Sequence, residues 1–280
     1  MKINAILSFF VIFIILSSSC EENKIGCNRE DVDNDWKKMN LNGKVKKIEM
    51  EMFKPITKFG LIEAGEKIVQ GSLGEHESVE FNEFGKIMKK KLFGHDGEYV
   101  YFYNSQQLER VESLFLYKAV KKYVYDSEGK VSEVNEYCNE ENCMGIGGMG
   151  DLLGKERLKY NDIKKVVRSD YYSGSGNLFL RIDYTYDIYQ GFPIYVKHTN
   201  VVNFNGKEEI SETNELSISY NKDNDKIREF VVSTSALLGK SERDYTYQYL
   251  YDEKKNWIKK VTYKDDKPET LSVRKIVYYN

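Results

Sequence analysis

The stretch Tyr123–Val131, which reads Tyr-Val-Tyr-Asp-Ser-Glu-Gly-Lys-Val, decides the fold of this chain. It places aromatic residues at alternate positions, then a short polar turn, then an aliphatic residue that opens a second charged run. Asp at the start of a turn bonds its own backbone, and Gly supplies a positive φ, so that the chain returns antiparallel. The stretch therefore predicts a β-hairpin.

This cassette recurs along most of the chain. An aromatic residue followed by Asn or Asp opens each further copy, at Phe81, Tyr103, Tyr160, Tyr186, Tyr220 and Tyr251. A second kind of turn lies between copies, with Gly after Asn or Leu, at Asn205-Gly206, Leu73-Gly74, Leu153-Gly154 and Leu238-Gly239. Repeated hairpins of this kind predict one sheet in which each hairpin packs beside the next.

From Gly43 onward apolar and charged residues alternate, as in Lys44–Phe53. Alternation with period two puts one set of side chains on each face of a strand. No strand–helix–strand unit is visible. We predict an all-β fold, an extended, twisted antiparallel meander of β-hairpin repeats that forms a single domain over residues 43–280. We expect its Tyr and Phe residues to be structural and to stack across strands.

The quoted stretch also carries a resemblance. Tyr-x-Tyr-Asp-x-x-Gly-Lys, at 123–130, resembles the YD repeat of RHS-type proteins, and residues 249–279 resemble the degenerate repeats of small bacterial envelope lipoproteins. The resemblance implies a hairpin sheet that winds or twists, and it implies no catalytic residues. The spacing lengthens after Tyr125 and most turns lack Gly, so a large enclosing shell is not expected.

The N-terminus reads as a targeting segment. Residues 1–19 contain Lys2 and the apolar run Ala5–Leu16, which is shorter than the roughly 20 residues of a membrane-spanning helix and fits a secretory signal peptide. Ser17–Cys20 resembles a bacterial lipobox, which implies acylation of Cys20. The alternative is cleavage after Ser19, which leaves Cys20 as a thiol. Residues 20–42 then form a tether with at most one short helix, around Trp36–Met39.

These features predict an envelope protein that faces the periplasm or the cell surface and is anchored to the outer membrane through the lipid on Cys20. The alternative is a secreted protein. We expect a disulfide between Cys138 and Cys143, which flank a turn-like tetrapeptide. If Cys20 is not acylated, it has Cys27 as a further candidate partner.

Several motifs resemble chemical sites but lack the required context. Gly145–Gly150 has the spacing of a dinucleotide fingerprint, yet no strand–helix unit surrounds it. Leu238–Ser241 lacks the first Gly of a phosphate loop, and Asp31–Asp35 lacks the Gly and Glu of a calcium loop. Three scattered histidines, each read as a solvated turn or strand-end residue, offer neither a zinc site nor a catalytic pair: His76, His95 and His198. We assign no catalytic residue, cofactor or metal.

The net charge limits the classes of partner that the chain can bind. The chain has 42 Lys+Arg against 44 Asp+Glu, a net charge of −2, which argues against nucleic acid as a partner. We predict a non-enzymatic binding or scaffold module that presents an aromatic-rich sheet to a glycan, a peptide or a partner protein. Two alternatives stay open: an immunity or accessory protein for a toxin, and a carboxylate-dependent hydrolase.

Overall fold

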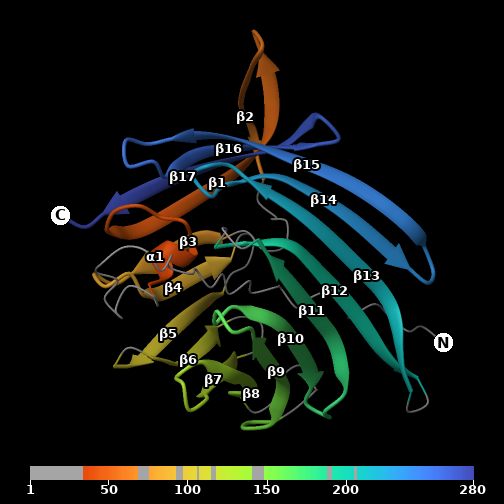
Figure 1. Cartoon of the computed structure of the whole chain (residues 1–280). Coiled ribbons are helices and arrows are strands. Elements are labelled where there is room, and N and C mark those ends of the chain that lie inside the picture. The colour runs from red at the N-terminus through yellow and green to blue at the C-terminus, as the bar shows by residue number, and fades with distance from the viewer. Residues whose placement is uncertain are drawn as a thin grey trace.

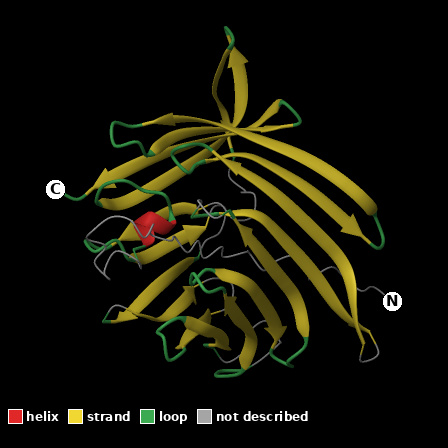
Figure 2. Ribbon diagram, viewed as in Figure 1, coloured by secondary structure: helices red, strands yellow, loops and turns green. Residues whose placement is uncertain are grey.

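The computed structural model describes residues 34–68, 76–92, 97–105, 107–114, 118–140, 148–187, 191–204 and 207–280. Nearly all of this part of the chain is β-strand (Figure 2). The single helix among the described residues is α1 (Asp35–Lys38), which confirms the short helix predicted around Trp36–Met39. The signal peptide and the first part of the tether lie outside the described residues.

The strands follow one another with short connections. The first nine are β1 (Val45–Lys58), β2 (Leu61–Lys67), β3 (His76–Phe81), β4 (Ile87–Leu92), β5 (Glu98–Asn104), β6 (Gln107–Leu114), β7 (Lys118–Tyr125), β8 (Val131–Cys138) and β9 (Leu152–Tyr160). The remaining eight are β10 (Val166–Ser173), β11 (Leu178–Tyr186), β12 (Pro193–Phe204), β13 (Lys207–Tyr220), β14 (Lys226–Ser235), β15 (Gly239–Tyr251), β16 (Trp257–Lys264) and β17 (Lys267–Tyr278).

The sheet closes on itself, so the prediction of an extended open meander is wrong. Every pairing is antiparallel and joins neighbours in sequence, except that β1 pairs with both β17 and β3. Ile48 on β1 lies opposite Ile276 on one side and Val79 on the other. The result is a 16-strand closed antiparallel barrel (Figure 1). Closure pairs the backbone groups that an open sheet would leave bare along its two edge strands.

β2 stands outside the ring. It pairs with the far half of β1 to form an arm that projects from the barrel (Figure 1). The arm carries cross-strand ion pairs, between Lys54 and Glu66 at 2.7 Å and between Lys67 and Glu51 at 2.6 Å. At its tip Phe59 is fully exposed and has a φ of 50°.

The cassette turns are built as the sequence predicts. In the turn after Tyr125, the Asp126 N–H donates to the Lys130 carbonyl at 2.8 Å, and Asp126 Oδ1 accepts from the Glu128 and Lys130 N–H groups, each at 2.9 Å. Four other turns have the same backbone hydrogen bond, from the N–H of the first turn residue to the carbonyl four residues later; they begin at Asn82, Asn161, Asn221 and Asp252. The fourth turn residue has a positive φ in all five, and it is Gly in two and Lys or Asn in the others: Gly85, Gly129, Lys164, Asn224 and Lys255.

One turn prediction fails. Leu153 and Gly154 lie inside β9, where Gly154 faces Glu136 of β8. The chain turns earlier instead, where Gly150 has a φ of 87° and the Gly150 N–H donates to the Cys138 carbonyl at 2.9 Å. The turn predicted at Leu238-Gly239 is confirmed between β14 and β15. Asn205-Gly206 and Leu73-Gly74 lie outside the described residues.

The cassette tyrosines tie each hairpin to the one before it. The Tyr125 hydroxyl donates to the Leu108 carbonyl at 2.8 Å, and the Tyr103 hydroxyl to the Ile87 carbonyl at 2.8 Å. Tyr160, Tyr186 and Tyr220 make the equivalent bonds to Val131, Val166 and Pro193, at 2.9 to 3.0 Å. These tyrosines are therefore structural, as predicted, and they act through hydrogen bonds to backbone more than through ring stacking.

The segment Asn34–Gly43, here called the clasp, crosses the end of the barrel where the cassette turns lie. Trp36 packs near Phe81 and donates its indole N–H to the Val45 carbonyl at 2.8 Å, within an apolar cluster that includes Ile48 and Val79. Gly85 permits this contact, because a Cβ there would lie 2.3 Å from Asn34 and 2.7 Å from Trp36.

Asparagines fasten the other half of the clasp. Asn40 donates to the Asp223 carbonyl at 2.8 Å and to Asp225 at 3.0 Å, within the β13–β14 turn. The Asn42 N–H donates to Asn256 Oδ1 at 2.7 Å, and Asn256 donates back to the Asn42 carbonyl at 2.8 Å. The clasp thus joins the β3–β4 turn to the β13–β14 and β15–β16 turns. These turns lie on either side of β1, the strand whose two pairings close the ring.

Tyr125→Phe should lower the free energy of unfolding by about 1 kcal/mol, because it removes one hydrogen bond to a strand carbonyl and keeps the ring. Thermal unfolding followed by circular dichroism measures this. Tyr263→Phe is the matched control, since its hydroxyl bonds the exposed side chain of Gln248, and it should change stability far less. Equal effects of the two substitutions would contradict the structural role of the cassette tyrosines.

Candidate functional site

The two faces of the barrel wall differ in chemistry. On one face, side chains of opposite charge pair across neighbouring strands, as Arg181 does with Asp170 at 2.6 Å and Lys197 with Glu215 at 3.0 Å. Similar pairs follow around the ring: Lys47–Glu80, Lys89–Glu98, Arg157–Glu133, Arg168–Asp183 and Arg228–Asp244. The other face carries the cassette tyrosines and most of the buried apolar residues.

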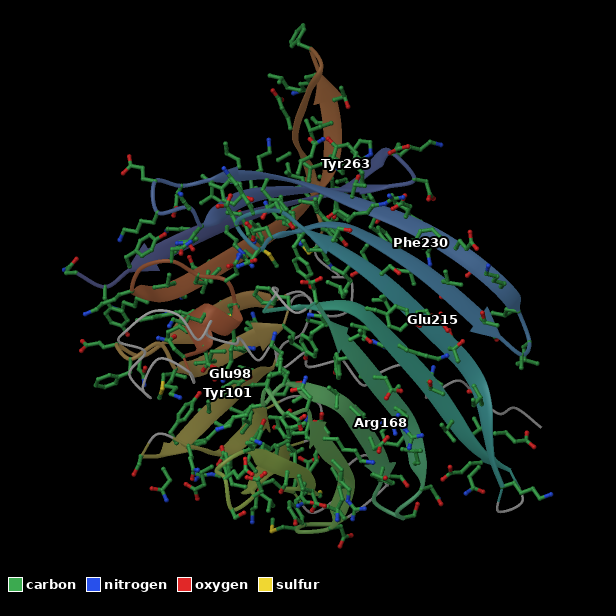
Figure 3. All side chains as sticks on the ribbon, in the orientation of Figure 1. Glu98, Tyr101, Arg168, Glu215, Phe230 and Tyr263 are labelled. Atoms are coloured by element: carbon green, nitrogen blue, oxygen red, sulfur yellow. The ribbon has the colours of Figure 1, made fainter. Side chains whose placement is uncertain are left out.

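The clasp identifies the apolar and aromatic face as the inner one. Asp35 accepts from the Ile87 N–H on β4, and Asn40 contacts the β13–β14 turn, on the far side of β1 and β17. A segment this short can contact both β4 and the β13–β14 turn only if it lies on the concave side of the wall. Burial raises the pKa of Tyr101 and Tyr123 on this face, and the charge of Asp35 adds to the increase. Figure 3 labels Tyr101 of the inner face, and Arg168 and Glu215 of the outer face.

The outer face is suited to water. A barrel that crosses a membrane presents an apolar band about 25 Å tall to the lipid, and a charged residue at mid-depth costs about 2–4 kcal/mol. Here Glu215 lies near the middle of β13 and Asp170 in the middle of β10, each paired with a cation on the next strand. Within the described residues no helix is long and apolar enough to span a membrane.

The inner face contains a row of polar side chains on four neighbouring strands. Asn200 on β12 and Asn214 on β13 each donate to Glu212 on β13, at 3.3 and 3.2 Å. Ser233 on β14 donates to Asn214 Oδ1, and Arg243 on β15 donates to the Ser233 hydroxyl at 2.9 Å. We call these five residues the polar row.

The polar row forms because its residues occupy matching positions. Asn200 lies opposite Glu212, Asn214 opposite Ser233, and Ser233 opposite Ser241, the residue two before Arg243 on the same face of β15. Residues opposite each other in an antiparallel pair point to the same face. Ser233 is buried, whereas the other four are half-buried. Their remaining exposure is on the inner face, and a ring of sixteen strands is in general wider than its side chains fill.

A second polar group lies farther round the inner wall, on β9 and β10. Burial raises the pKa of the Glu156 carboxyl, against hydrogen bonds from Tyr171 and Ser169 and the charge of Lys121. Burial also raises the pKa of Tyr184. Beside the polar row, burial lowers the pKa of His198 below its ordinary 6.5. The inner face therefore combines aromatic rings with groups that donate and accept hydrogen bonds.

The residues singled out in the sequence do not gather into one site. Cys20, Cys27, Cys143 and His95 lie outside the described residues. Cys138 is disulfide-bonded, and its predicted pairing with Cys143 stays a prediction. His76 begins β3. His198 lies within β12, so the prediction that it ends a strand is wrong. Asp223-Asn224-Asp225 forms a turn, as predicted. Among the described side chains, no group of three or more His, Cys, Asp or Glu is placed to hold a metal ion.

The sequence carries a signal for the polar row. Tyr220 marks the inner face at the end of β13, and counting back by twos reaches Leu216, Asn214 and Glu212. Residues that lie an even number of positions from a cassette Tyr on the same strand point inward with it. Packing alone would favour apolar residues at these positions, because burying a polar group is costly.

Comparisons with known proteins give distant likenesses of shape. No family model matches the chain, and no curated protein matches it. A crystal structure of a porin-like protein from Bacteroides uniformis matches with a TM-score of 0.45 and 10% identity, over 84% of this chain and 98% of that one. A porin-like protein from Bacteroides vulgatus gives 0.46 and 12%, over 84% and 99%.

A structure of TcdB2-TccC3 gives a TM-score of 0.31 and 9% identity, over 66% of this chain and 12% of that one. The barrel assignment rests on the strand pairings of this chain and takes nothing from these scores. Membership of the YD repeat family is not established by the comparisons.

Glu156→Gln should make thermal stability less dependent on pH. Because the pKa of Glu156 is raised on folding, its contribution is complete below about pH 4.5, the unfolded value, and is lost as the pH rises through the folded pKa. The Gln variant should match the parent near pH 4 and unfold at a higher temperature at pH 8.

Glu215→Gln on the outer face is the control with the opposite sign. A hydrogen bond from Lys197 lowers the pKa of Glu215, so this variant should lose a little stability at pH 8. A Glu156→Gln variant that is less stable than the parent at pH 8 would show that the carboxyl is not held in a costly charged state.

Proposed function

We propose that this protein is a non-enzymatic binding barrel of the cell envelope that holds a glycan against its inner face. The observation that carries the proposal is the polar row. Amide, carboxylate, hydroxyl and guanidinium groups lie side by side across β12–β15, and together they present both donors and acceptors. Sugar hydroxyl groups need both, and specific sites place a few such groups among apolar walls.

Aromatic side chains accompany the row. Tyr245 lies two residues after Arg243 on the same face of β15, and Tyr184 lies on β11 opposite Val196 of β12. Aromatic rings supply flat apolar surfaces with a polar edge, which suits a ligand whose faces are C–H and whose rim is hydroxyl. Four neighbouring strands span about 14 Å at the usual spacing, so the row has room for a short oligosaccharide.

A binding role is preferred to the hydrolase alternative because of the contacts of Glu156. The groups that act on its pKa are Tyr171, Lys121 and Ser169, and the other carboxyl on this part of the inner face, Glu136, lies two positions away and is already paired with Lys121 at 3.7 Å. Hydrolysis of a glycosidic bond normally needs two carboxyl groups facing the same bond. The toxin-accessory alternative has no observation in the fold that favours it.

Export is part of the proposal. It is supported by the predicted leader at residues 1–19 and by the disulfide at Cys138, since disulfides persist in oxidising compartments. The charged outer face fits a barrel held at a membrane through a lipid on Cys20, with its wall in water. We propose the outer membrane as the site of the anchor.

Asn214→Ala should weaken glycan binding by at least tenfold, because Asn214 joins two members of the polar row. Isothermal titration with the mature chain, purified in detergent, against a panel of oligosaccharides measures the affinity. Thr213→Ala changes the next residue on the same strand, on the outer face, and should bind as the parent does. An absence of glycan binding by the parent, or equal binding by both variants, would refute the proposal.

Radiolabelled palmitate should be incorporated into the parent chain and not into Cys20→Ala. The variant should also move from the membrane to the soluble fraction, because a lipid supplies the membrane affinity that the charged outer face lacks. Labelling of Cys27→Ala should equal that of the parent. An unlabelled parent would leave secretion after cleavage at Ser19 as the remaining route.

A further inference from the structure

The two charged ends of the polar row, Glu212 and Arg243, differ in how fully they are hydrogen-bonded. Both carboxylate oxygens of Glu212 accept hydrogen bonds from within the row, one from Asn214 and one from Asn200. At the other end Arg243 donates one bond, from Nη2 to Ser233. Its Nε is buried and has no hydrogen-bond partner among the described residues. Glu212 and Arg243 are separated by Asn214 and Ser233, so their charges are not in contact.

Arg243 and Arg274 are the two arginines of the described chain whose Nε is buried without a hydrogen-bond partner. Five others pair with carboxylates: Arg110, Arg157, Arg168, Arg181 and Arg228. Arg274 stacks on Trp257, with 3.3 Å between the guanidinium carbon and the ring centre, and lies in the field of Asp225. The two acids beside Arg243 in sequence face outward, where Glu242 pairs with Lys240 and Asp244 with Arg228.

A guanidinium on the inner wall needs an anion. Arg keeps its charge at every accessible pH, and a charge withdrawn from water is costly unless a partner meets it. The guanidinium is a planar fork whose paired N–H groups fit the two oxygens of a carboxylate, and because Nε is buried, a ligand would meet the Nη groups. The two nearby carboxylates of the inner face are already engaged, Glu212 within the row and Glu229 of β14 with Lys226 at 2.6 Å, so a ligand is the remaining source of an anion.

We propose that Arg243 is the subsite for the carboxylate of an acidic sugar, so that the barrel prefers glycans that contain uronic acid. This inference rests on the proposed glycan-binding function and names its ligand class. The remaining members of the row bind hydroxyl groups, and Arg243 selects for charge. Discrimination arises because a neutral sugar in the same place would leave the guanidinium without an acceptor.

The test uses an oligogalacturonate and its carboxyl-reduced form, which have the same backbone and differ only at C6, a carboxylate in the first and a neutral hydroxymethyl group in the second. The mature chain should bind the uronate at least tenfold more tightly, and added salt should reduce this advantage. Arg243→Gln should lose the preference, because it removes the guanidinium that meets the carboxylate. Arg228→Gln removes an Arg from the outer face of the adjacent strand and should keep the preference.

Each other outcome has a separate meaning. Binding of the reduced form with equal affinity, or a preference that survives in Arg243→Gln, would overturn the acidic-sugar inference and leave glycan binding in place. A failure of the parent to bind either oligosaccharide or any neutral glycan would overturn both. Circular dichroism and unfolding temperature of each variant show that a loss of preference is not a loss of fold.

Discussion

The pairing of β1 along both of its edges is the constraint on which the rest of the structure depends. Ile48 lies between Val79 of β3 and Ile276 of β17, and this double register turns a row of hairpins into a ring. Closure removes the free edges and gives the wall an inside and an outside. The segregation of charge follows from it, because ion pairs can face water on the convex side while tyrosines and the polar row share the interior.

The cassette tyrosines then fix which residues point inward. Five of these tyrosines, Tyr103, Tyr125, Tyr160, Tyr186 and Tyr220, donate to a carbonyl of the preceding hairpin, and the register shifts by one residue beside the turn, as between Val124 and Tyr125. A shift along a whole strand would exchange its two faces. Because these shifts lie at strand ends, next to the turns, the alternation along the rest of each strand is kept.

Short stretches of sequence predict much of this local structure. Asp126 and its counterparts predict the turns because the side chain bonds backbone only two and four residues away. Lys164 and Lys255 show that the backbone adopts a positive φ even where Gly is missing. Closure could not be predicted in this way, since it depends on contacts between residues as distant as Ile48 and Ile276. Unless closure is known, Asn214 and Glu212 cannot be assigned to the inside of a barrel, and the candidate site cannot be predicted.

The breadth of the ring explains why polar residues on the inner wall point to a ligand. In a small barrel the inward side chains fill the interior, and a polar row would be buried at a cost that only complete mutual bonding offsets. A ring of sixteen strands is in general wider than its side chains fill, and Asn200, Glu212 and Arg243 of the inner face are half-buried here. The apolar cluster beneath Trp36 needs no ligand to account for it, because the clasp already covers it. Within the polar row, Arg243 Nε is the one buried side-chain atom that has no hydrogen-bond partner among the described residues. A row that is ordered along its length and unsatisfied at one charged end is better explained by recognition than by packing.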